Sequence, residues 1–341
     1  MQQTSHPCIG VLGAGTWGIA LARLLRLNGC SVTVWSAIAQ EIQTLENERR
    51  HPRLPEMELP DGILYTTDME TACRDKEMLV LAVPSVFVRE TAAKMRPFLR
   101  DGQIVVDVAK GIEESTLLTM SGIIEEELSG LDVKVVALSG PTHAEEVARD
   151  LPTAIVSACE DENVARYVQQ VFSNGFLRVY TNTDKKGVEI CGALKNVIAL
   201  ATGISAGLGY GDNAKAALIT RGIAEIARLG SAAGCTEATF SGLTGLGDLV
   251  VTCTSRHSRN NRAGFLMGQG LSPEEATREV GMVVEGLNTL PAAVKMGEKY
   301  NVELPIIQTV NRVVKGELSP ADVVNALLSR EMKSEIPVSF L

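Results

Sequence analysis

One lysine stands in the most apolar long stretch of the sequence. Lys195 is the only charged residue between Glu189 and Asp212. Burial of an ammonium group lowers its pKa, which brings a lysine into the range of a general acid or base near neutral pH. The pattern equally fits a lysine whose aliphatic chain covers apolar surface while its ammonium group stays in water. Glycines at 203 and 207 continue a small-residue spacing of four, so we expect this helix to pack closely.

A glycine-rich stretch at 243–249 carries one acidic residue. Gly242, Gly245 and Gly247 permit close approach of the backbone, and Asp248 is the single acid in a long uncharged run. The composition alone slightly favours a flexible loop between two helices.

A cluster of arginines, amides and hydroxyls precedes a predicted helix. It runs from Ser255 to Arg262 and includes Ser258, Arg259 and Asn260. Backbone N–H groups at a helix start and a nearby guanidinium both bind phosphate, so the segment suits a phosphorylated ligand. A solvated basic turn is the alternative interpretation.

The N-terminal segment has the spacing of a dinucleotide-binding turn. Gly13, Gly15 and Gly18 follow an apolar run at 8–12 and precede a helical pattern at 17–28. In a βαβ unit the first glycine allows the turn and the second lets the backbone approach a pyrophosphate. The third lets helix and strand pack closely. We therefore predict a dinucleotide-binding turn rather than an ordinary glycine-rich connection.

The position that selects between NADH and NADPH carries neither of the usual side chains. An acid at the end of the second strand binds the ribose 2′-hydroxyl of NAD, and an arginine nearby accommodates the 2′-phosphate of NADP. Ser36 and Ala37 stand there, and the next acid along the chain is Glu41. We expect both cofactors to be accepted, with Ser36 able to donate a hydrogen bond to a 2′-phosphate.

The elements that must position these groups change character near residue 184. Before it, strand patterns alternate with helical ones, and the run at 78–83 is apolar throughout, as in a strand covered on both faces. Ligands of such a sheet gather at the carboxyl ends of its strands. The predicted strands are 8–12, 31–35, 63–66, 78–83, 103–108, 133–138, 153–157 and 176–180, and the predicted helices are 17–28, 38–49, 86–98, 115–129 and 161–172.

Helical periodicity dominates the second half. Ser272 before Pro273, and Ser319 before Pro320, each resemble an N-cap followed by proline at the first helical position. We predict an α/β chain in which a Rossmann-like doubly wound domain, 1–184, binds the dinucleotide and an all-α domain, 185–341, binds substrate and carries the catalytic lysine. The predicted helices of the second domain are 185–207, 213–233, 259–268, 273–280, 286–300, 305–315 and 320–329.

Composition narrows the possible functions. The chain of 341 residues is 45% hydrophobic and 21% charged, as in ordinary globular proteins, and its net charge of −9 includes no basic run. This argues against binding to nucleic acid or anionic membranes. The N-terminus has no charged segment before its apolar run, so we expect no signal peptide. The apolar stretch at 194–208 is too short to span a bilayer.

Cysteine and histidine usage points away from disulfides and metals. The seven cysteines are scattered and form no CxxC pair, which favours a reduced, cytoplasmic compartment. The four histidines are isolated in sequence, and no cysteine–histidine set has metal-ligand spacing. We therefore expect no metal site.

Seven short motifs occur in order along nearly the whole chain. They are Gly-Ala-Gly-Thr-Trp-Gly at 13–18, Ala-Lys-Gly-Ile-Glu at 109–113, Ser-Gly-Pro-Thr-His-Ala-Glu-Glu at 139–146, Leu-Lys-Asn-Val at 194–197, Leu-Thr-Gly-Leu-Gly-Asp-Leu at 243–249, Ser-Arg-Asn at 258–260 and Val-Val-Glu-Gly at 283–286. Together they resemble the bacterial-type family of NAD(P)-dependent glycerol-3-phosphate dehydrogenases.

The resemblance implies a reaction. It is reversible hydride transfer between C4 of the nicotinamide of NAD(P)H and C2 of dihydroxyacetone phosphate, which gives sn-glycerol 3-phosphate for glycerophospholipid biosynthesis. A cytoplasmic homodimer without a metal, without nucleic acid and without stable membrane insertion is the implied form of the enzyme.

The resemblance also implies roles for the residues that match its motifs. Lys195 is the expected general acid and base. The expected substrate contacts are Lys110, Gly140, Thr142, Lys195, Asp248, Ser258, Arg259 and Asn260. The expected cofactor contacts, glycine turn included, are Gly13, Gly15, Thr16, Trp17, Gly18, Lys110, Ala144, Arg259, Val283 and Glu285. Since Lys110 and Lys195 come from different halves, we expect the active site in the crevice between them.

Two departures from the family pattern fall near the adenosine end of the cofactor. Ser36-Ala37 replaces a segment that often carries a basic residue, and Arg53 replaces a residue that is often aromatic. Both bear on the choice between NADH and NADPH rather than on the reaction.

Two other functions share parts of this pattern. A related dehydrogenase could act on another small acid or alcohol, but the cluster at 258–260 favours a phosphorylated substrate. A non-enzymatic redox sensor would bind a dinucleotide without needing an acid or base, and Lys195 argues against it.

Overall fold

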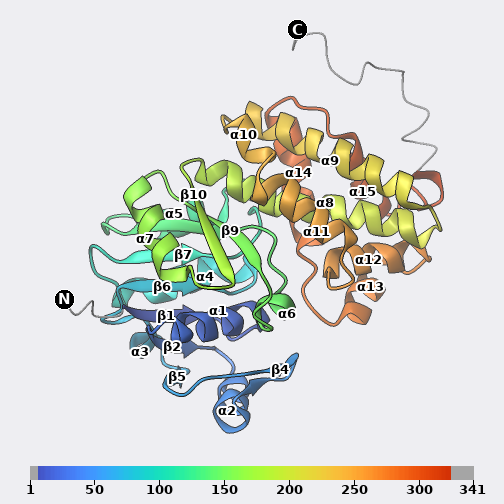
Figure 1. The fold of residues 1–341 in the computed structure, drawn as a ribbon. Coiled ribbons are helices and arrows are strands. Elements are labelled where there is room, and N and C mark those ends of the chain that lie inside the picture. The colour runs from blue at the N-terminus through green and yellow to red at the C-terminus, as the bar shows by residue number, and fades with distance from the viewer. Residues whose placement is uncertain (1–6, 324–341) are drawn as a thin grey trace.

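The computed structural model describes residues 7–323, and the observations below concern these residues. The first half is built on an eight-stranded sheet, and the second half is helical (Figure 1). The predicted fold class, a Rossmann-like part followed by an all-α part, is confirmed. Among the described residues, no strand follows β10 (Leu177–Asn182).

The sheet has the strand order β10-β9-β8-β7-β6-β1-β2-β5. From β5 to β8 this is the 3-2-1-4-5-6 order of a dinucleotide-binding sheet. Neighbouring strands are parallel, except that β8 and β9 are antiparallel. The strands are β1 (Cys8–Leu12), β2 (Ser31–Trp35), β5 (Ile63–Thr66), β6 (Met78–Leu81), β7 (Ile104–Asp107), β8 (Lys134–Ser139), β9 (Thr153–Ala158) and β10.

Helices cover both faces of the sheet because its central strands are apolar on both sides. In β6, Met78 and Val80 belong to one buried cluster, with α1 and α7, whereas Leu79 and Leu81 belong to another, with α3, α4 and α5. The continuous apolar run thus encodes a doubly covered strand, as predicted. These helices are α1 (Thr16–Leu27), α3 (Met69–Cys73), α4 (Val88–Met95), α5 (Met120–Glu127) and α7 (Glu162–Phe172).

Two predicted helices of this half are shorter in the structure. The segment 86–98 divides into the 3-10 turn η1 (Ser85–Phe87), α4 and the 3-10 turn η2 (Arg96–Phe98), with Pro97 at the second break. The segment 115–129 becomes helical only at α5, because Leu117 adopts a left-handed conformation and Ile112 bridges to Thr119.

Several short elements were not predicted. After α2 (Ala39–Glu48), β3 (Arg50–His51) and β4 (Leu54–Glu58) pair as a separate two-stranded sheet, and α6 (Ala144–Val147) follows β8. The helix α2 ends at Arg49, whose φ of 50° is left-handed. Short elements of this kind carry too few periodic positions to stand out in the sequence.

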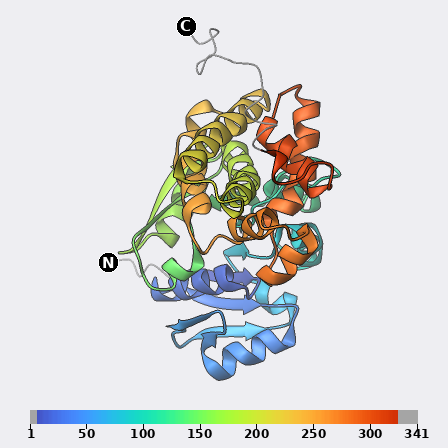
Figure 2. The same ribbon diagram turned by 90° about the vertical axis from the view of Figure 1, so that its right-hand side faces the viewer.

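Helix α8 (Lys185–Gly207) runs through the centre of the helical half, with the other helices around it (Figure 2). It is long and apolar enough to cross a membrane, but 89% of its apolar window is buried inside the protein. The remaining elements are α9 (Asp212–Ala232), α10 (Glu237–Phe240), the π-helical turn η3 (Leu243–Gly247), α11 (Asp248–Thr254), α12 (Arg259–Gly268), α13 (Pro273–Val280), α14 (Glu285–Lys299) and α15 (Pro305–Val314). Most of the predicted helix 320–329 lies outside the described residues.

Helices α8 and α12 meet backbone to backbone. A Cβ atom on Gly203 would lie 2.1 Å from the carbonyl oxygen of Asn261, and one on Gly207 would lie 2.2 Å from that of Phe265. From the other side, a Cβ on Gly264 would lie 2.2 Å from the carbonyl oxygen of Leu200. Only glycine allows this approach, which confirms the close packing expected from the spacing of small residues.

We predict that Gly203→Ala lowers the free energy of unfolding by at least about 1–3 kcal/mol, because the methyl group would collide with backbone rather than with a flexible side chain. Urea denaturation followed by circular dichroism measures the change. Gly175→Ala is the matched control, since a Cβ there meets nothing within 4 Å. Equal stability of the two variants would show that the helices can separate at no cost.

Candidate active site

The carboxylate of Asp248 binds two lysines. Its Oδ2 lies 2.7 Å from Nζ of Lys110, and its Oδ1 lies 2.8 Å from Nζ of Lys195. Lys195 also donates a hydrogen bond to Oγ1 of Thr252 at 2.6 Å. Lys195 is 5% exposed and Asp248 is 2% exposed, so Lys195 is buried and does not extend its ammonium group into water.

Three separate elements bring this cluster together. Lys110 follows the carboxyl end of β7, Lys195 lies midway along α8, and Asp248 is the first residue of α11. The turn η3, which leads into α11, packs so closely that a Cβ on Gly245 would lie 2.0 Å from the carbonyl oxygen of Phe240. The interpretation of 243–249 as a flexible loop is therefore wrong, and its glycines serve to place Asp248 in the protein interior.

The electrostatics of the cluster favour a titratable lysine. Burial lowers the pKa of Lys195 to about 8, against the attraction of Asp248, and the nearby Lys110 lowers it further. Burial opposes ionisation of Asp248, but the two ammonium groups outweigh it and hold the pKa of the carboxyl below its usual range. Two ammonium groups around one carboxylate leave an excess positive charge, which suits an anionic ligand or a developing oxyanion.

Lys110 links this cluster to the loop after β8. Its Nζ donates to the carbonyl oxygen of Gly140 at 3.0 Å, and the hydroxyl of Thr142 donates to the same oxygen at 3.1 Å. Gly140 has a φ of 142°, a backbone conformation that favours glycine at this turn. The structure therefore brings Lys110, Gly140 and Thr142 to the Lys195–Asp248 pair, with Ala144 two residues further on at the start of α6.

Two of the three residues at 258–260 have structural roles in the helical half. Oγ of Ser258 caps α12 by accepting from the N–H of Asn261 at 3.2 Å. Asn260 is buried between the side chain of Asn196, at 3.0 Å, and the N–H of Gly286, at 2.8 Å. Both residues thus hold the helices in place.

Arg259, in contrast, is exposed at the edge of the site. Its guanidinium reaches the carbonyl oxygen of Val283 at 3.3 Å, and the carboxylates of Glu285 and Glu145 lie close enough to attract it. Of the three residues of the motif, Arg259 is the one with a side chain available to a ligand.

The glycine turn fits a dinucleotide. A Cβ on Gly13 would lie 2.5 Å from the carbonyl oxygen of Ala82, and one on Gly18 would lie 2.1 Å from that of Gly13, whereas Gly15 faces open space. No side chain caps the N-terminus of α1, so its N–H groups are available to an anion. Thr16 and Trp17, the first residues of α1, are partly exposed beside this opening.

The two halves meet at the same end of the sheet. Glu285, at the start of α14, accepts hydrogen bonds from the N–H of Ser85, at 3.1 Å, and from its hydroxyl. Ser85 follows β6 and lies close in sequence to Ala82, the neighbour of the glycine turn. Val283 and Glu285 therefore lie near the predicted pyrophosphate site, and Ser85, which follows a strand at the edge of the sheet where ligands are expected, connects the two halves there.

Two histidines that look isolated in the sequence lie side by side. The ring centroids of His143 and His257 are 5.8 Å apart, and one comes from each half of the chain. Burial, and then the charge of Lys195, lower the pKa of His143, which places its imidazole near the lysine cluster. Only the fold reveals this pair. Across the described residues there is no group of three or more His, Cys, Asp or Glu side chains that could hold a metal.

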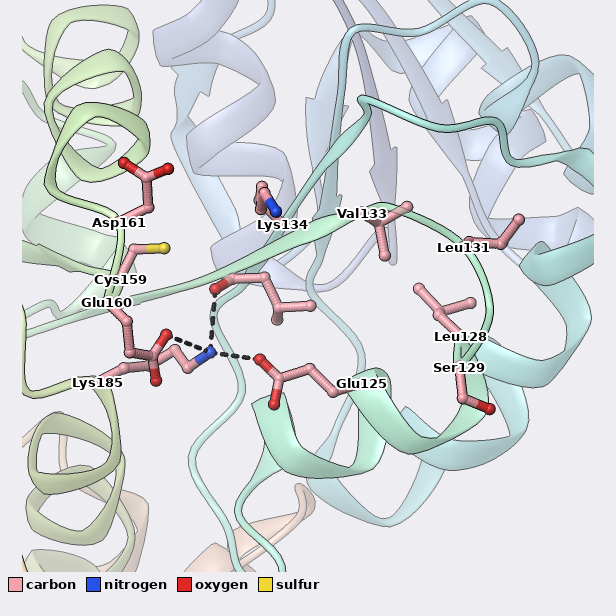
Figure 3. Close-up of a pocket in the computed structure, with 11 residues that line it drawn as sticks. Glu125, Leu128, Ser129, Leu131, Val133, Lys134, Cys159, Glu160, Asp161 and Lys185 are labelled. Carbon is pink, nitrogen blue, oxygen red and sulfur yellow. Dashed lines mark hydrogen bonds and ion pairs between the residues drawn. The ribbon is translucent and has the colours of Figure 1, made fainter.

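A surface cavity of about 410 Å³ lies at the start of α8 and contains none of the predicted site residues (Figure 3). Nζ of Lys185 points into it and pairs with the carboxylate of Glu125 and, at 3.0 Å, with that of Glu160. It also donates to the carbonyl oxygen of Val135 at 3.3 Å. These bonds neutralise the ammonium group and connect the start of α8 to the sheet half.

Comparison with known proteins identifies relatives over the whole chain. The family profile described as the NAD-dependent glycerol-3-phosphate dehydrogenase N-terminus matches residues 8–165, and that of its C-terminus matches residues 184–325. Glycerol-3-phosphate dehydrogenase [NAD(P)+] 2 of Lactobacillus delbrueckii subsp. bulgaricus is 58% identical over 332 residues, which cover 96% of this chain and 98% of that protein.

The similarity extends to more distant proteins and to a solved structure. Glycerol-3-phosphate dehydrogenase [NAD(P)+] of Bacillus subtilis is 48% identical over 330 residues, or 96% of each chain. The crystal structure of glycerol-3-phosphate dehydrogenase from Coxiella burnetii superposes with a TM-score of 0.91 at 36% identity, and covers 95% of this chain and 99% of that one.

We predict that Asp248→Asn lowers the pKa of Lys195 further, by at least about one unit, because burial and Lys110 still act while the attracting carboxylate is lost. The ¹³Cε chemical shift of Lys195, assigned with Lys195→Met, reports its titration. Asp212→Asn, at the exposed start of α9, is the control. A midpoint that stays near 8 in Asp248→Asn would contradict the charge balance described above.

Proposed function

The chain belongs to the family of NAD-dependent glycerol-3-phosphate dehydrogenases, and from this premise we propose how its side chains divide the reaction. The protein is an oxidoreductase that interconverts dihydroxyacetone phosphate and sn-glycerol 3-phosphate by hydride transfer with NAD(P)H. Its product feeds glycerophospholipid biosynthesis. The roles of individual residues given below are our proposal.

Lys195 acts as the general acid and base. When bound, NAD(P)H supplies the hydride that reduces C2 of dihydroxyacetone phosphate. As the carbonyl becomes an alcohol, negative charge develops on its oxygen, which needs both stabilisation and a proton. The ammonium group of Lys195 polarises the carbonyl and gives up its proton, and in the oxidation the neutral amine accepts the hydroxyl proton. The observation that carries this role is a buried lysine with a pKa of about 8, held 2.8 Å from Asp248.

Asp248 and Lys110 position Lys195 and set the net charge around it. With Lys110 and Lys195 both protonated, the three charges leave one positive charge in excess, which an oxyanion at C2 neutralises. After proton transfer, Lys110 and Asp248 remain as a neutral pair, so the product state leaves no uncompensated charge in this cluster. Gly140 and Thr142 complete the substrate contacts on this side. The carbonyl oxygen of Gly140 accepts hydrogen bonds from both Lys110 and Thr142.

Arg259 anchors the phosphate of the substrate. Its guanidinium is exposed at the N-terminus of α12, where the positive end of the helix dipole favours an anion. Ser258 and Asn260 support this anchor by fixing the start of α12. Its proximity to Val283 and Glu285 makes Arg259 a cofactor contact as well.

The dinucleotide lies along the carboxyl edge of the sheet. We assign its pyrophosphate to the turn of Gly13, Gly15 and Gly18 at the start of α1. The further cofactor contacts in this proposal are Thr16, Trp17, Lys110, Ala144, Arg259, Val283 and Glu285.

The larger organisation of the enzyme is part of the same proposal. Residues 1–184 form the dinucleotide-binding domain and 185–341 the helical substrate-binding and catalytic domain, supported by the end of β10 at Asn182 and the start of α8 at Lys185. All seven cysteines are free, which supports a reducing, cytoplasmic location. The family resemblance supports a homodimer that neither binds nucleic acid nor inserts stably into a membrane.

We predict that Lys195→Met lowers kcat by at least about 10²-fold while the dissociation constant for NADH changes little, because the variant loses only the proton donor. Stopped-flow assays and NADH fluorescence titration measure the two quantities. Lys186→Met, on the exposed side of the same helix, is the control and keeps wild-type turnover.

The pH dependence of the wild-type enzyme also tests the role of Lys195 as general acid and base. Since reduction needs the protonated lysine, kcat/KM for dihydroxyacetone phosphate falls as pH rises through about 8, and kcat/KM for glycerol 3-phosphate rises. A folded Lys195→Met variant that turns over within a few-fold of wild type would assign the proton transfer to another group, with Lys110 the first candidate.

We predict that Arg259→Lys raises KM for dihydroxyacetone phosphate by at least about tenfold, because lysine keeps the charge but loses the two-pronged contact with phosphate oxygens. KM for unphosphorylated dihydroxyacetone changes far less. Arg256→Lys, three residues earlier and also exposed, is the matched control. Equal effects of Arg259→Lys on both substrates would rule out a phosphate contact.

A further inference from the structure

The end of β2 carries a carboxylate that comes from the next helix. Ser36 follows β2 and is 4% exposed, and its hydroxyl donates a hydrogen bond to Oε2 of Glu41 at 2.6 Å. The same Oγ accepts from the N–H of Ile38 at 3.1 Å. The hydroxyl proton of Ser36 is therefore already in use, and Ser36 has no second proton for a 2′-phosphate.

This carboxylate lies beside the glycine turn. The carbonyl oxygen of Trp35, the last residue of β2, accepts a hydrogen bond from the N–H of Gly13 at 2.9 Å. The imidazole of His51 lies in the same region: burial and the charge of Arg53 lower its pKa, while the carboxylate of Glu41 and the backbone of Ala14 raise it. In a Rossmann sheet, the adenosine ribose lies at this end of the second strand, and an acid there binds the 2′-hydroxyl.

One oxygen of Glu41 is available to a ligand. Oε2 takes the bond from Ser36, whereas Oε1 accepts no hydrogen bond from the residues that the structure describes. Glu41 is half-buried in the first turn of α2, where the N-terminal end of the helix dipole favours a negative charge. Glu41 is thus held beside Ser36 at the end of β2, with one oxygen free to accept a hydrogen bond from a ligand.

The arginines that follow α2 are engaged elsewhere. Arg49 pairs with Asp61 at 2.9 Å, and Arg50 donates to the carbonyl oxygen of Pro55 at 2.8 Å. Arg53 crosses to the helical half and donates to the carbonyl oxygen of Gly281 at 3.1 Å. Each of the three guanidinium groups therefore has a partner other than a group at the end of β2, so a 2′-phosphate there would meet Glu41 without a dedicated cation.

We propose that Glu41 is the specificity-determining residue that makes this enzyme prefer NADH over NADPH. Its free oxygen accepts the ribose 2′-hydroxyl and its charge repels a 2′-phosphate, while Ser36 acts as a positioning residue that fixes the carboxylate. The proposal deepens the proposed function and rests on it for the class of cofactor. It replaces the expectation that both cofactors are accepted alike, because the acid missing from positions 36 and 37 is supplied by Glu41.

Direct binding tests the proposal without relying on turnover. Dissociation constants for NADH and NADPH are measured by nicotinamide fluorescence for wild type, Glu41→Gln and the control Glu48→Gln, an exposed glutamate at the far end of α2. We expect wild type and Glu48→Gln to bind NADH at least about tenfold more tightly than NADPH. In Glu41→Gln the NADPH affinity rises by about tenfold, and the ratio of the two constants approaches one.

Two further readouts separate a direct role from a structural one. The preference of wild type weakens as salt increases, because repulsion between Glu41 and the 2′-phosphate is screened, whereas the ratio for Glu41→Gln does not depend on salt. Ser36→Ala keeps the charge but frees the carboxylate, so it loses part of the NADH affinity and keeps the rejection of NADPH. Circular dichroism confirms that each variant is folded.

The possible results are distinguishable. Wild type binding NADPH as tightly as NADH, or Glu41→Gln leaving the ratio within twofold of wild type, overturns the role of Glu41 while leaving the dehydrogenase itself intact. Binding of neither dinucleotide to folded wild type overturns the proposed dinucleotide site, and with it this proposal. Steady-state kinetics with dihydroxyacetone phosphate and each cofactor shows the same preference in kcat/KM when the proposal holds.

Discussion

Burial of charged side chains along α8 is the constraint on which the rest of the structure depends. A buried charge is tolerated only where a partner and further hydrogen bonds replace the water that it loses. Lys185 and Glu189 in the first turns find their partners in the sheet half, where Ser121 binds Glu189 through its N–H and its hydroxyl. Lys195 finds its partner, Asp248, in the helical half. One helix is thereby fixed to both halves, which sets how the Lys195–Asp248 pair lies relative to the sheet.

The sequence predicts the sheet well because the information is local. A strand such as β6 must be apolar at every position to be covered on both faces, and the fingerprint of Gly13, Gly15 and Gly18 is encoded within six residues. The burial of Lys195 is different, since its partner Asp248 lies far along the chain and belongs to another helix. The apolar pattern around the lysine is compatible with both exposure and burial of its ammonium group. Only the position of Asp248 in the fold decides between them.

The order of the stretch at 243–249 and the bond from Ser36 to Glu41 are not evident in the sequence for the same physical reason. The stretch at 243–249 looks like a loop because its order comes from the contact of Gly245 with the backbone of Phe240, which no local pattern encodes. In the sequence, Ser36 is a candidate hydrogen-bond donor to a 2′-phosphate, because residues at the end of β2 are interpreted without the helix α2 that follows them. Glu41 lies only five residues further on, so a search for acids that the first turn of the next helix can deliver would have found it.

The glycine contact between α8 and α12 has a consequence for the length of molecule that the enzyme can process. Because the two backbones touch at Gly203 and Gly207, neither helix can slide or tilt against the other without a collision. Lys195 stands on one of these helices and Arg259 begins the other, so the separation of the backbone positions of the proposed proton donor and the proposed phosphate anchor is set by main-chain contact. Under the roles proposed above, this fixed main-chain separation favours a phosphorylated ketone with one spacing between carbonyl and phosphate over longer and shorter ones.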